Sequence, residues 1–215
     1  MTARDPYKPF GDFLRAFPKE DRSWQPIDAA YLEAQVQDAF AVTVPSALVE
    51  FWERVGAGYF ADRELYVFGD GKVPMDRDCL VEWNRKDLWL EIYPRPNQGG
   101  PVFFAETCFG DQIGFRWEGE QCRAVLYAPE TFEAFVLADS PRSLFASVLD
   151  ERYACTDPDR LRRVAARLGP LPEGMHYVPI VSPLVGGSDN ADNFTVETPN
   201  AHMRTALALY KSLHG

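Results

Sequence analysis

The side chains that most often carry out catalysis are scarce in this sequence and are not grouped. Its three histidines, His176, His202 and His214, lie within the last 40 of its 215 residues. No two of them have the four-residue spacing that places two imidazoles on one face of a helix. We therefore expect no metal site and no catalytic histidine. His202, near the start of a predicted helix, is expected to pack or to bond a backbone carbonyl.

The cysteines do not form a recognisable metal or disulfide motif. Cys79, Cys108, Cys122 and Cys155 are separated by 29, 14 and 33 residues, and none belongs to a C-x-x-C pair. In a chain that shows no secretory signal, such isolated cysteines are typical of reduced packing residues.

Glycine-rich segments indicate turns and not catalytic loops. Gly69-Asp70-Gly71-Lys72 is preceded by Tyr66, where a phosphate-binding loop requires glycine, and is followed by Val73, where it requires Ser or Thr. Gly186-Gly187-Ser188 lacks the spacing of a G-x-S-x-G nucleophile. Nucleophilic hydrolysis and phosphate binding therefore have no support.

Acidic pairs are the remaining candidates for chemistry. Two pairs of carboxylates lie close enough in the sequence to act as general acid and base: Glu118 with Glu120, and Glu130 with Glu133. Such chemistry requires one carboxyl group in an apolar pocket, whereas these residues lie beside predicted turns. We interpret them as surface charges and expect a binding protein with no cofactor, not an enzyme.

The composition excludes several classes of protein and favours a basic partner. The chain is 46% hydrophobic and 13% aromatic, too apolar for intrinsic disorder, and its net charge is -10. Residues 1–150 hold 15 Lys/Arg and 25 Asp/Glu, and residues 151–215 hold seven of each. This charge repels nucleic acid and anionic membrane and attracts basic proteins. No apolar segment follows the charged start, so we expect a cytoplasmic protein.

Hydrophobic periodicity predicts both helices and strands. Ser140-Pro141 begins one expected helix, with Leu144, Phe145, Val148 and Leu149 on its apolar face. The other expected helices are 29–40 with Asp28 as cap, 45–55, 158–168 with Thr156 as cap, and a terminal helix capped by Asn200. The expected strands are 65–68, 101–105, and a hairpin of 113–117 and 122–126 joined by a turn at 118–120.

These elements predict an α+β fold with a central, mostly antiparallel sheet flanked by helices. We expect one domain over residues 1–150 and a small helical C-terminal module over residues 151–215, packed on the first. The mixture of aromatic and charged residues in 82–93 is typical of a binding surface. The same pattern is also compatible with Trp83, Trp89 and Tyr93 as core residues.

Three segments resemble known families. Residues 44–60, in which a proline-led helix ends at Gly56 and Gly58 before a strand, resemble the start of the SUKH superfamily and of the related GAD-like domains. Residues 102–115, with an apolar strand before Phe109-Gly110-Asp111, are similar to their next motif. Residues 168–203 resemble the C-terminal module of type VI secretion DNase immunity proteins.

This resemblance implies a bacterial antitoxin that binds a cognate toxin effector, such as a basic DNase, and blocks it without chemistry of its own. Partner-binding candidates are acidic residues for steering and aromatic residues as anchors: Asp62, Glu64, Asp70, Glu106, Asp111, Glu118 and Glu120, with Tyr59, Trp83 and Trp117. The main alternative is a domain that binds a small molecule or a regulatory peptide in a pocket lined by the aromatic cluster. An enzyme with acidic catalytic residues is a third hypothesis.

Overall fold

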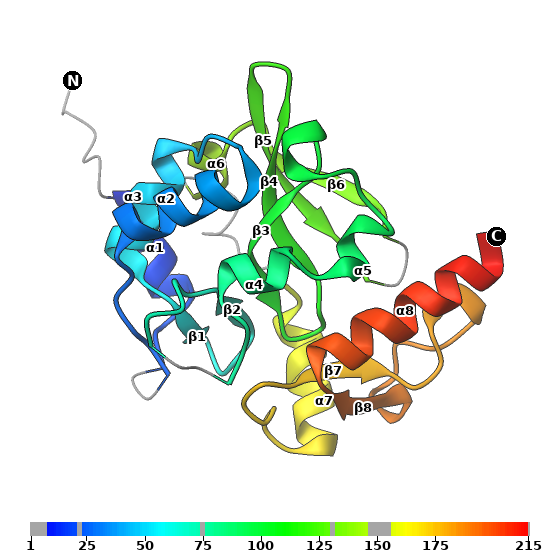
Figure 1. The fold of residues 1–215 in the computed structure, drawn as a ribbon. Helices are drawn as coiled ribbons and strands as arrows, with labels where there is room; N and C mark the ends of the chain where they lie inside the picture. Colours follow the sequence, from blue (N-terminus) through cyan, green and yellow to red (C-terminus); the bar gives the residue numbers. More distant parts are fainter. Residues whose placement is uncertain (1–7, 21–22, 74–75, 130–131, 146–155, 215) are drawn as a thin grey trace.

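A six-stranded antiparallel sheet, in the order β1-β2-β3-β4-β5-β6, organises the protein (Figure 1). The structure, a computed structural model, describes residues 8–20, 23–73, 76–129, 132–145 and 156–214. The strands are β1 (Gly58–Phe60), β2 (Leu65–Val67), β3 (Val102–Thr107), β4 (Gln112–Glu118), β5 (Gln121–Tyr127) and β6 (Ala134–Ala138). Helices flank this sheet, so the predicted α+β fold class is confirmed.

A helix lies at each predicted position, and two of the predicted caps are wrong. The predicted helices are α2 (Ala29–Phe40), α3 (Ser46–Val55), α6 (Pro141–Ser143), α7 (Pro158–Leu168) and α8 (Pro199–His214). Three further helices are not predicted from the sequence: α1 (Lys8–Ala16), α4 (Leu80–Asn84) and α5 (Asp87–Leu90). Asn200 lies inside α8 and is not its cap; the Thr198 hydroxyl accepts from the Ala201 N–H at 3.4 Å. The Asp28 carboxylate caps α2 by accepting from the Tyr31 N–H at 3.1 Å. Asp157, not Thr156, caps α7, because its carboxylate accepts from the Arg160 N–H at 2.8 Å. Val148 and Leu149 lie outside the described residues.

Helices cover both faces of the sheet. Consecutive residues of a strand point to opposite faces of the sheet, and the side chains of β3 contact aromatic rings on both faces. The Phe104 ring lies 6.1 Å from the Phe51 ring of α3, whereas the Phe103 ring lies 4.8 Å from the Trp89 ring of α5. Phe51 also stacks on Phe145 at 4.4 Å. All six residues of β3 are therefore buried, and this strand is the centre of the core.

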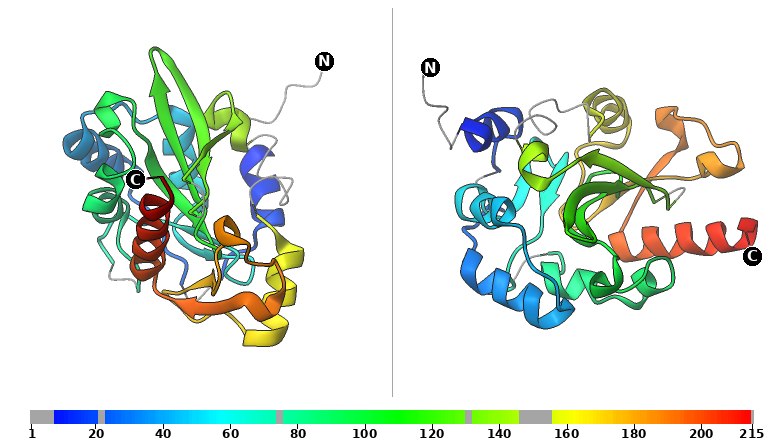
Figure 2. Two further views of the ribbon diagram at one scale, coloured as in Figure 1. Left: turned by 90° about the vertical axis from the view of Figure 1, so that its right-hand side faces the viewer. Right: turned by 90° about the horizontal axis from the view of Figure 1, so that it is seen from above.

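The C-terminal part gathers at the end of the sheet opposite the tip of the β4–β5 hairpin (Figures 1 and 2). Besides α7 and α8 it contains an antiparallel pair of strands, β7 (His176–Pro179) and β8 (Phe194–Glu197), and two turns of 3-10 helix, η4 (Pro183–Val185) and η5 (Ala191–Asn193). The expected helical module is therefore a mixed one.

Two apolar contacts join the C-terminal part to the sheet. Phe109, from the β3–β4 connection, packs in a small second core with Tyr177 and Phe194. The second contact is made by α8, whose Met203 and Leu207 belong to the main core. Met203 is fully buried, so the end of the described chain contributes to the packing of the first 150 residues.

Shortening Met203 to alanine is expected to destabilise the main body as well as the C-terminal part. The substitution leaves a cavity at a fully buried site, and we expect a loss of about 3 kcal/mol of unfolding free energy. All five tryptophans lie before residue 118, so their fluorescence during urea unfolding reports on the main body alone. An unchanged tryptophan transition in Met203→Ala would show that the two parts unfold separately; Leu213→Ala, at an exposed position of the same helix, is the control.

Candidate binding groove and a buried charge cluster

The β4–β5 hairpin carries three of the predicted partner-binding residues to its tip. Gly119 forms the turn with a positive φ of 64°, so that Glu118 and Glu120 stand on either side of it. Glu118 pairs with Arg116 and with Arg123, the latter at 2.8 Å. Glu120 is exposed and makes no ion pair with any described residue. The tip therefore presents one neutralised and one uncompensated carboxylate.

Trp117 attaches the hairpin to the connection between α2 and α3. Its indole N–H donates to the Thr43 carbonyl at 2.9 Å, and the ring remains half-buried. Between these two elements lies a groove of about 570 Å³. Its lining comes from three segments: residues 41–43, residues 96–99, and Trp117 with Gly119. We call this feature the hairpin groove.

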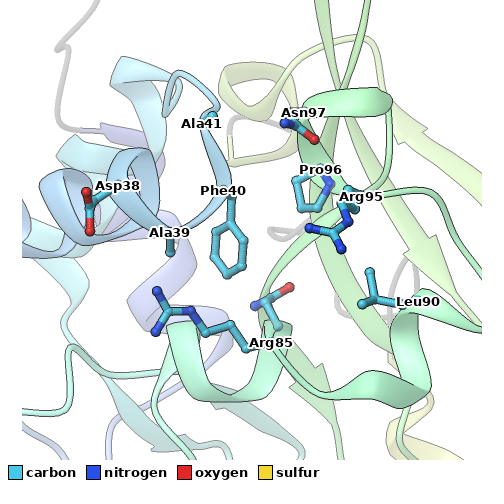
Figure 3. Close-up of a pocket in the computed structure, with 10 residues that line it drawn as sticks. Asp38, Ala39, Phe40, Ala41, Arg85, Leu90, Arg95, Pro96 and Asn97 are labelled. Atoms are coloured by element: carbon cyan, nitrogen blue, oxygen red, sulfur yellow. The ribbon is translucent and has the colours of Figure 1, made fainter.

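A second cavity of about 330 Å³ adjoins the hairpin groove, because both are lined by Ala41, Pro96 and Asn97 (Figure 3). Its further lining is Asp38, Ala39, Phe40, Asn84, Arg85, Leu90 and Arg95. We call it the arginine pocket. Its floor is partly apolar, and its rim holds two guanidinium groups and one carboxylate.

The backbone around both cavities is fixed by local hydrogen bonds. The Asn84 side chain acts as an extra strand partner: its amide donates to the Phe103 carbonyl at 2.8 Å and its oxygen accepts from the Phe103 N–H at 2.7 Å. Gly100 closes the 95–100 turn by donating to the Arg95 carbonyl, and a Cβ at this position would lie 1.9 Å from the Pro94 carbonyl oxygen. Arg85 and Arg95 therefore project from rigid supports.

The remaining predicted acidic residues lie at the other end of the sheet. Asp62 is exposed in the β1–β2 turn, which meets β3 where Leu65 pairs with Thr107. The seven-residue strand β4 separates that end from Glu118, a distance of about 20 Å. Asp111, also at that end, is half-buried and accepts from the Thr107 hydroxyl at 2.9 Å. The predicted steering residues thus do not form one surface.

Five predicted partner-binding residues are buried, and this corrects the expectation that they contact a partner. Tyr59 and Trp83 are 3% and 1% exposed: the Tyr59 hydroxyl accepts from the Gly174 N–H at 2.6 Å, and the Trp83 indole donates to Gln112 at 2.7 Å. Glu64 and Glu106 are fully buried. Asp70, 6% exposed, accepts from the backbone N–H groups of Asp28 and Lys72.

Glu106 is the centre of a charge cluster between the sheet and the C-terminal part. It forms an ion pair with Arg77, accepts from the Gln112 amide at 2.9 Å, and lies 3.4 Å from His176 Nε2. His176 Nδ1 in turn lies 3.2 Å from His202 Nδ1. We name Arg77, Glu106, Gln112, His176 and His202 the charge cluster; each side chain comes from a different segment.

Burial keeps both histidines of the charge cluster neutral. Loss of water around the ring, followed by the positive charge of Arg77, holds the pKa of His176 well below its usual value. Burial, followed by the neighbouring His176, lowers the pKa of His202 to about 3. With both rings neutral, one Nδ1 can donate to the other. Of the two expectations for His202, packing is confirmed, because the residue is buried against His176. The backbone carbonyl is wrong as its partner, since its ring bonds His176.

The close approach of His202 depends on a glycine. Gly110 adopts a φ of 88°, and a Cβ there would lie 2.8 Å from the His202 ring. Within the described residues, no group of histidine, cysteine and acidic side chains has an arrangement that could hold a metal ion. The charge cluster thus has the geometry of a structural joint between β3, β7 and α8.

The arginines of α7 also have structural partners. Arg160 and Arg163 pair with Asp189 at 2.8 and 3.2 Å, and Arg167 pairs with Asp192 at 2.9 Å. The Arg160 guanidinium also lies over the rings of Phe109 and Phe194. These side chains hold the 189–192 segment against α7.

In the part of the chain that is described, no helix is long and apolar enough to cross a membrane.

Comparison with known proteins supports the fold alone. No protein-family model matches the sequence, and no curated protein matches it. A solved structure, described as the crystal structure of Atu4351 from Agrobacterium tumefaciens, is similar with a TM-score of 0.63 at 13% identity. The similarity covers 92% of this chain and 88% of that chain. The same architecture is therefore found in a protein of very different sequence, over both the sheet and the C-terminal part.

The neutral histidines predict that stability falls as the solution becomes acidic. Below about pH 6.5 the unfolded chain binds protons that the buried rings of His176 and His202 do not, so the free energy of unfolding decreases with falling pH. Each histidine contributes a slope of about 1.4 kcal/mol per pH unit.

Urea unfolding between pH 8 and pH 5 measures this slope. His202→Asn keeps a polar group near the position of Nδ1 and is expected to give a shallower slope, whereas His214→Asn, at an exposed position of α8, is expected to leave it unchanged. Equal slopes in the unaltered protein and both variants would contradict the conclusion that His202 is buried in its neutral form.

Proposed function

We propose that this protein is a cytoplasmic immunity protein that binds a cognate toxin, a basic type VI nuclease, and occludes its active site. The observation that carries the proposal is the hairpin groove, which is lined by Trp117 and Gly119 and adjoins the arginine pocket. Glu118 and Glu120 stand on either side of Gly119 at the hairpin tip. A concave surface with an aromatic wall and a charged rim is suited to a protein segment. The sequence resemblance to SUKH and GAD-like immunity proteins supports the same function.

Charge is the second support. The excess of acidic residues lies within residues 1–150, the part that contains the hairpin groove. A nuclease must itself attract DNA and is therefore basic, so the two proteins would associate quickly at low salt. The uncompensated Glu120 at the tip is well placed for this encounter.

The charge cluster supports a binding role over a catalytic one. Its histidines are 1% and 3% exposed and join different segments of the chain, so their rings do not face a substrate. The alternative of a small-molecule domain with an aromatic pocket is less well supported, because Trp83 and Trp89 pack against Phe68 and Phe103 in the core. The two cavities at the surface have a mixed lining, in which Phe40, Leu90 and Trp117 lie among charged and polar residues, and among the described residues no cluster of several aromatic rings forms a wall.

The first experiment is co-purification with the product of the adjacent gene at low salt and at about 0.5 M salt, where exposed charges are heavily screened. We expect a one-to-one complex that abolishes a toxic activity and weakens at high salt. A non-toxic neighbour that is not retained would remove the proposal.

Neutralising the hairpin tip is expected to slow association with the toxin. Glu118→Gln with Glu120→Gln removes two negative charges at the groove, so the association rate should fall several-fold at low salt and little at about 0.5 M salt. Glu53→Gln with Asp76→Asn removes two exposed charges elsewhere and is the matched control. Surface plasmon resonance measures both; equal rates for the two double variants would exclude the tip from the binding surface.

A further inference from the structure

The arginine pocket contains two arginines that form no ion pair with the residues that the structure describes. Most arginines of the described residues form ion pairs: Arg15, Arg63, Arg77, Arg116, Arg123, Arg142, Arg160, Arg162, Arg163 and Arg167. Arg85 and Arg95 form none with the described residues, although the chain has 32 acidic and 22 basic residues. Both line the same cavity. An unpaired guanidinium group is available to a carboxylate from outside.

The two guanidinium groups approach the cavity from different elements. Arg85 ends α4, and Arg95 precedes the 3-10 turn η1 (Pro96–Gln98). Figure 3 shows the Phe40 ring between them, with Leu90 on the far side of Arg95. Leu90 is 48% exposed and adds apolar surface. The cavity therefore combines a place for a negative group with a place for an aliphatic stem.

Asp38 sets the charge that the occupant must have. Its carboxylate is on α2 at the rim, beyond Ala39 and away from Arg95 in Figure 3. Two arginines and one aspartate give the arginine pocket a net charge of +1. A single carboxylate matches this charge, and a basic or polar group next to it would face Asp38.

We infer that the arginine pocket binds an aspartate or glutamate side chain from an extended segment of the protein partner. The basic residues of that segment lie at the hairpin tip. The inference rests on the proposed function and adds the chemistry of the partner. A protein segment fits better than a small anion, because the arginine pocket and the hairpin groove are neighbours that share Ala41, Pro96 and Asn97 as lining, so one extended segment can contact both. Opposite charges at the two ends fix the direction of the bound segment.

The contribution of the arginine pocket differs in kind from that of the hairpin tip. Exposed charges at the tip act at a distance and change the association rate. A guanidinium group that binds a carboxylate through two parallel hydrogen bonds acts only after contact, so its loss changes the dissociation rate. The two sites are therefore separable in one kinetic experiment.

The test is the affinity of Arg85→Ala/Arg95→Ala for the toxin, measured by surface plasmon resonance. We expect the dissociation constant to rise by about tenfold or more, mainly through faster dissociation, with the association rate within about twofold. Arg85→Lys/Arg95→Lys keeps the positive charges but lacks the planar guanidinium group. Its dissociation constant should therefore lie between those of the unaltered protein and of Arg85→Ala/Arg95→Ala. The matched control is Arg15→Ala/Arg162→Ala, which removes two arginines whose side chains are each 74% exposed. An unchanged melting temperature confirms that each variant is folded.

Each outcome decides the question. If the unaltered protein does not bind the toxin, the proposed function fails and the inference with it. If the unaltered protein binds and Arg85→Ala/Arg95→Ala binds equally well, the inference is overturned while the proposed function stands. If succinate raises the melting temperature of the unaltered protein but not of this variant, and toxin affinity is the same for both, the arginine pocket holds a free carboxylate and the partner segment is excluded.

Discussion

A fully buried glutamate in the central strand is the constraint on which the structure depends. Glu106 lies in β3, where both faces of the sheet are covered, and an unpaired carboxylate there would cost several kcal/mol or more. Arg77, Gln112 and His176 surround it. These partners come from a loop, a neighbouring strand and the C-terminal part, so satisfying one charge fixes the relative positions of three regions.

The hairpin groove, at the opposite end of the sheet, is held by hydrogen bonds between side chains and the backbone and not by a buried charge. Its walls are connections between secondary-structure elements, which carry few apolar contacts of their own. Side chains such as Asn84 and Trp117 bind neighbouring backbone groups and hold these connections in place. The surface proposed for recognition is therefore supported by the sheet but is free to vary in sequence without disturbing the charge cluster.

The sequence predicts the elements of this fold better than it predicts the site. Apolar spacing identifies helices such as 29–40 and the hairpin with its turn at 118–120, because these signals are local. Tyr59 is predicted as a partner contact and lies in the core, and Trp83, for which the sequence leaves a binding surface and the core both open, also lies in the core. Local composition does not tell which face of a short segment is buried. Arg85, Arg95 and Phe40 carry no motif. They come together only through the fold, as do His176 and His202, which are 26 residues apart.

The order of the charge cluster along the chain has a consequence for synthesis. Glu106 leaves the ribosome about 100 residues before His202, which at about 5–20 residues per second is a delay of about 5–20 s. For the first 70 of these residues neither histidine has been synthesised, and the apolar side chains of α8 come last. Until then the Glu106 carboxylate lacks its C-terminal partner, so water or a chaperone would occupy this end of the sheet before the fold closes.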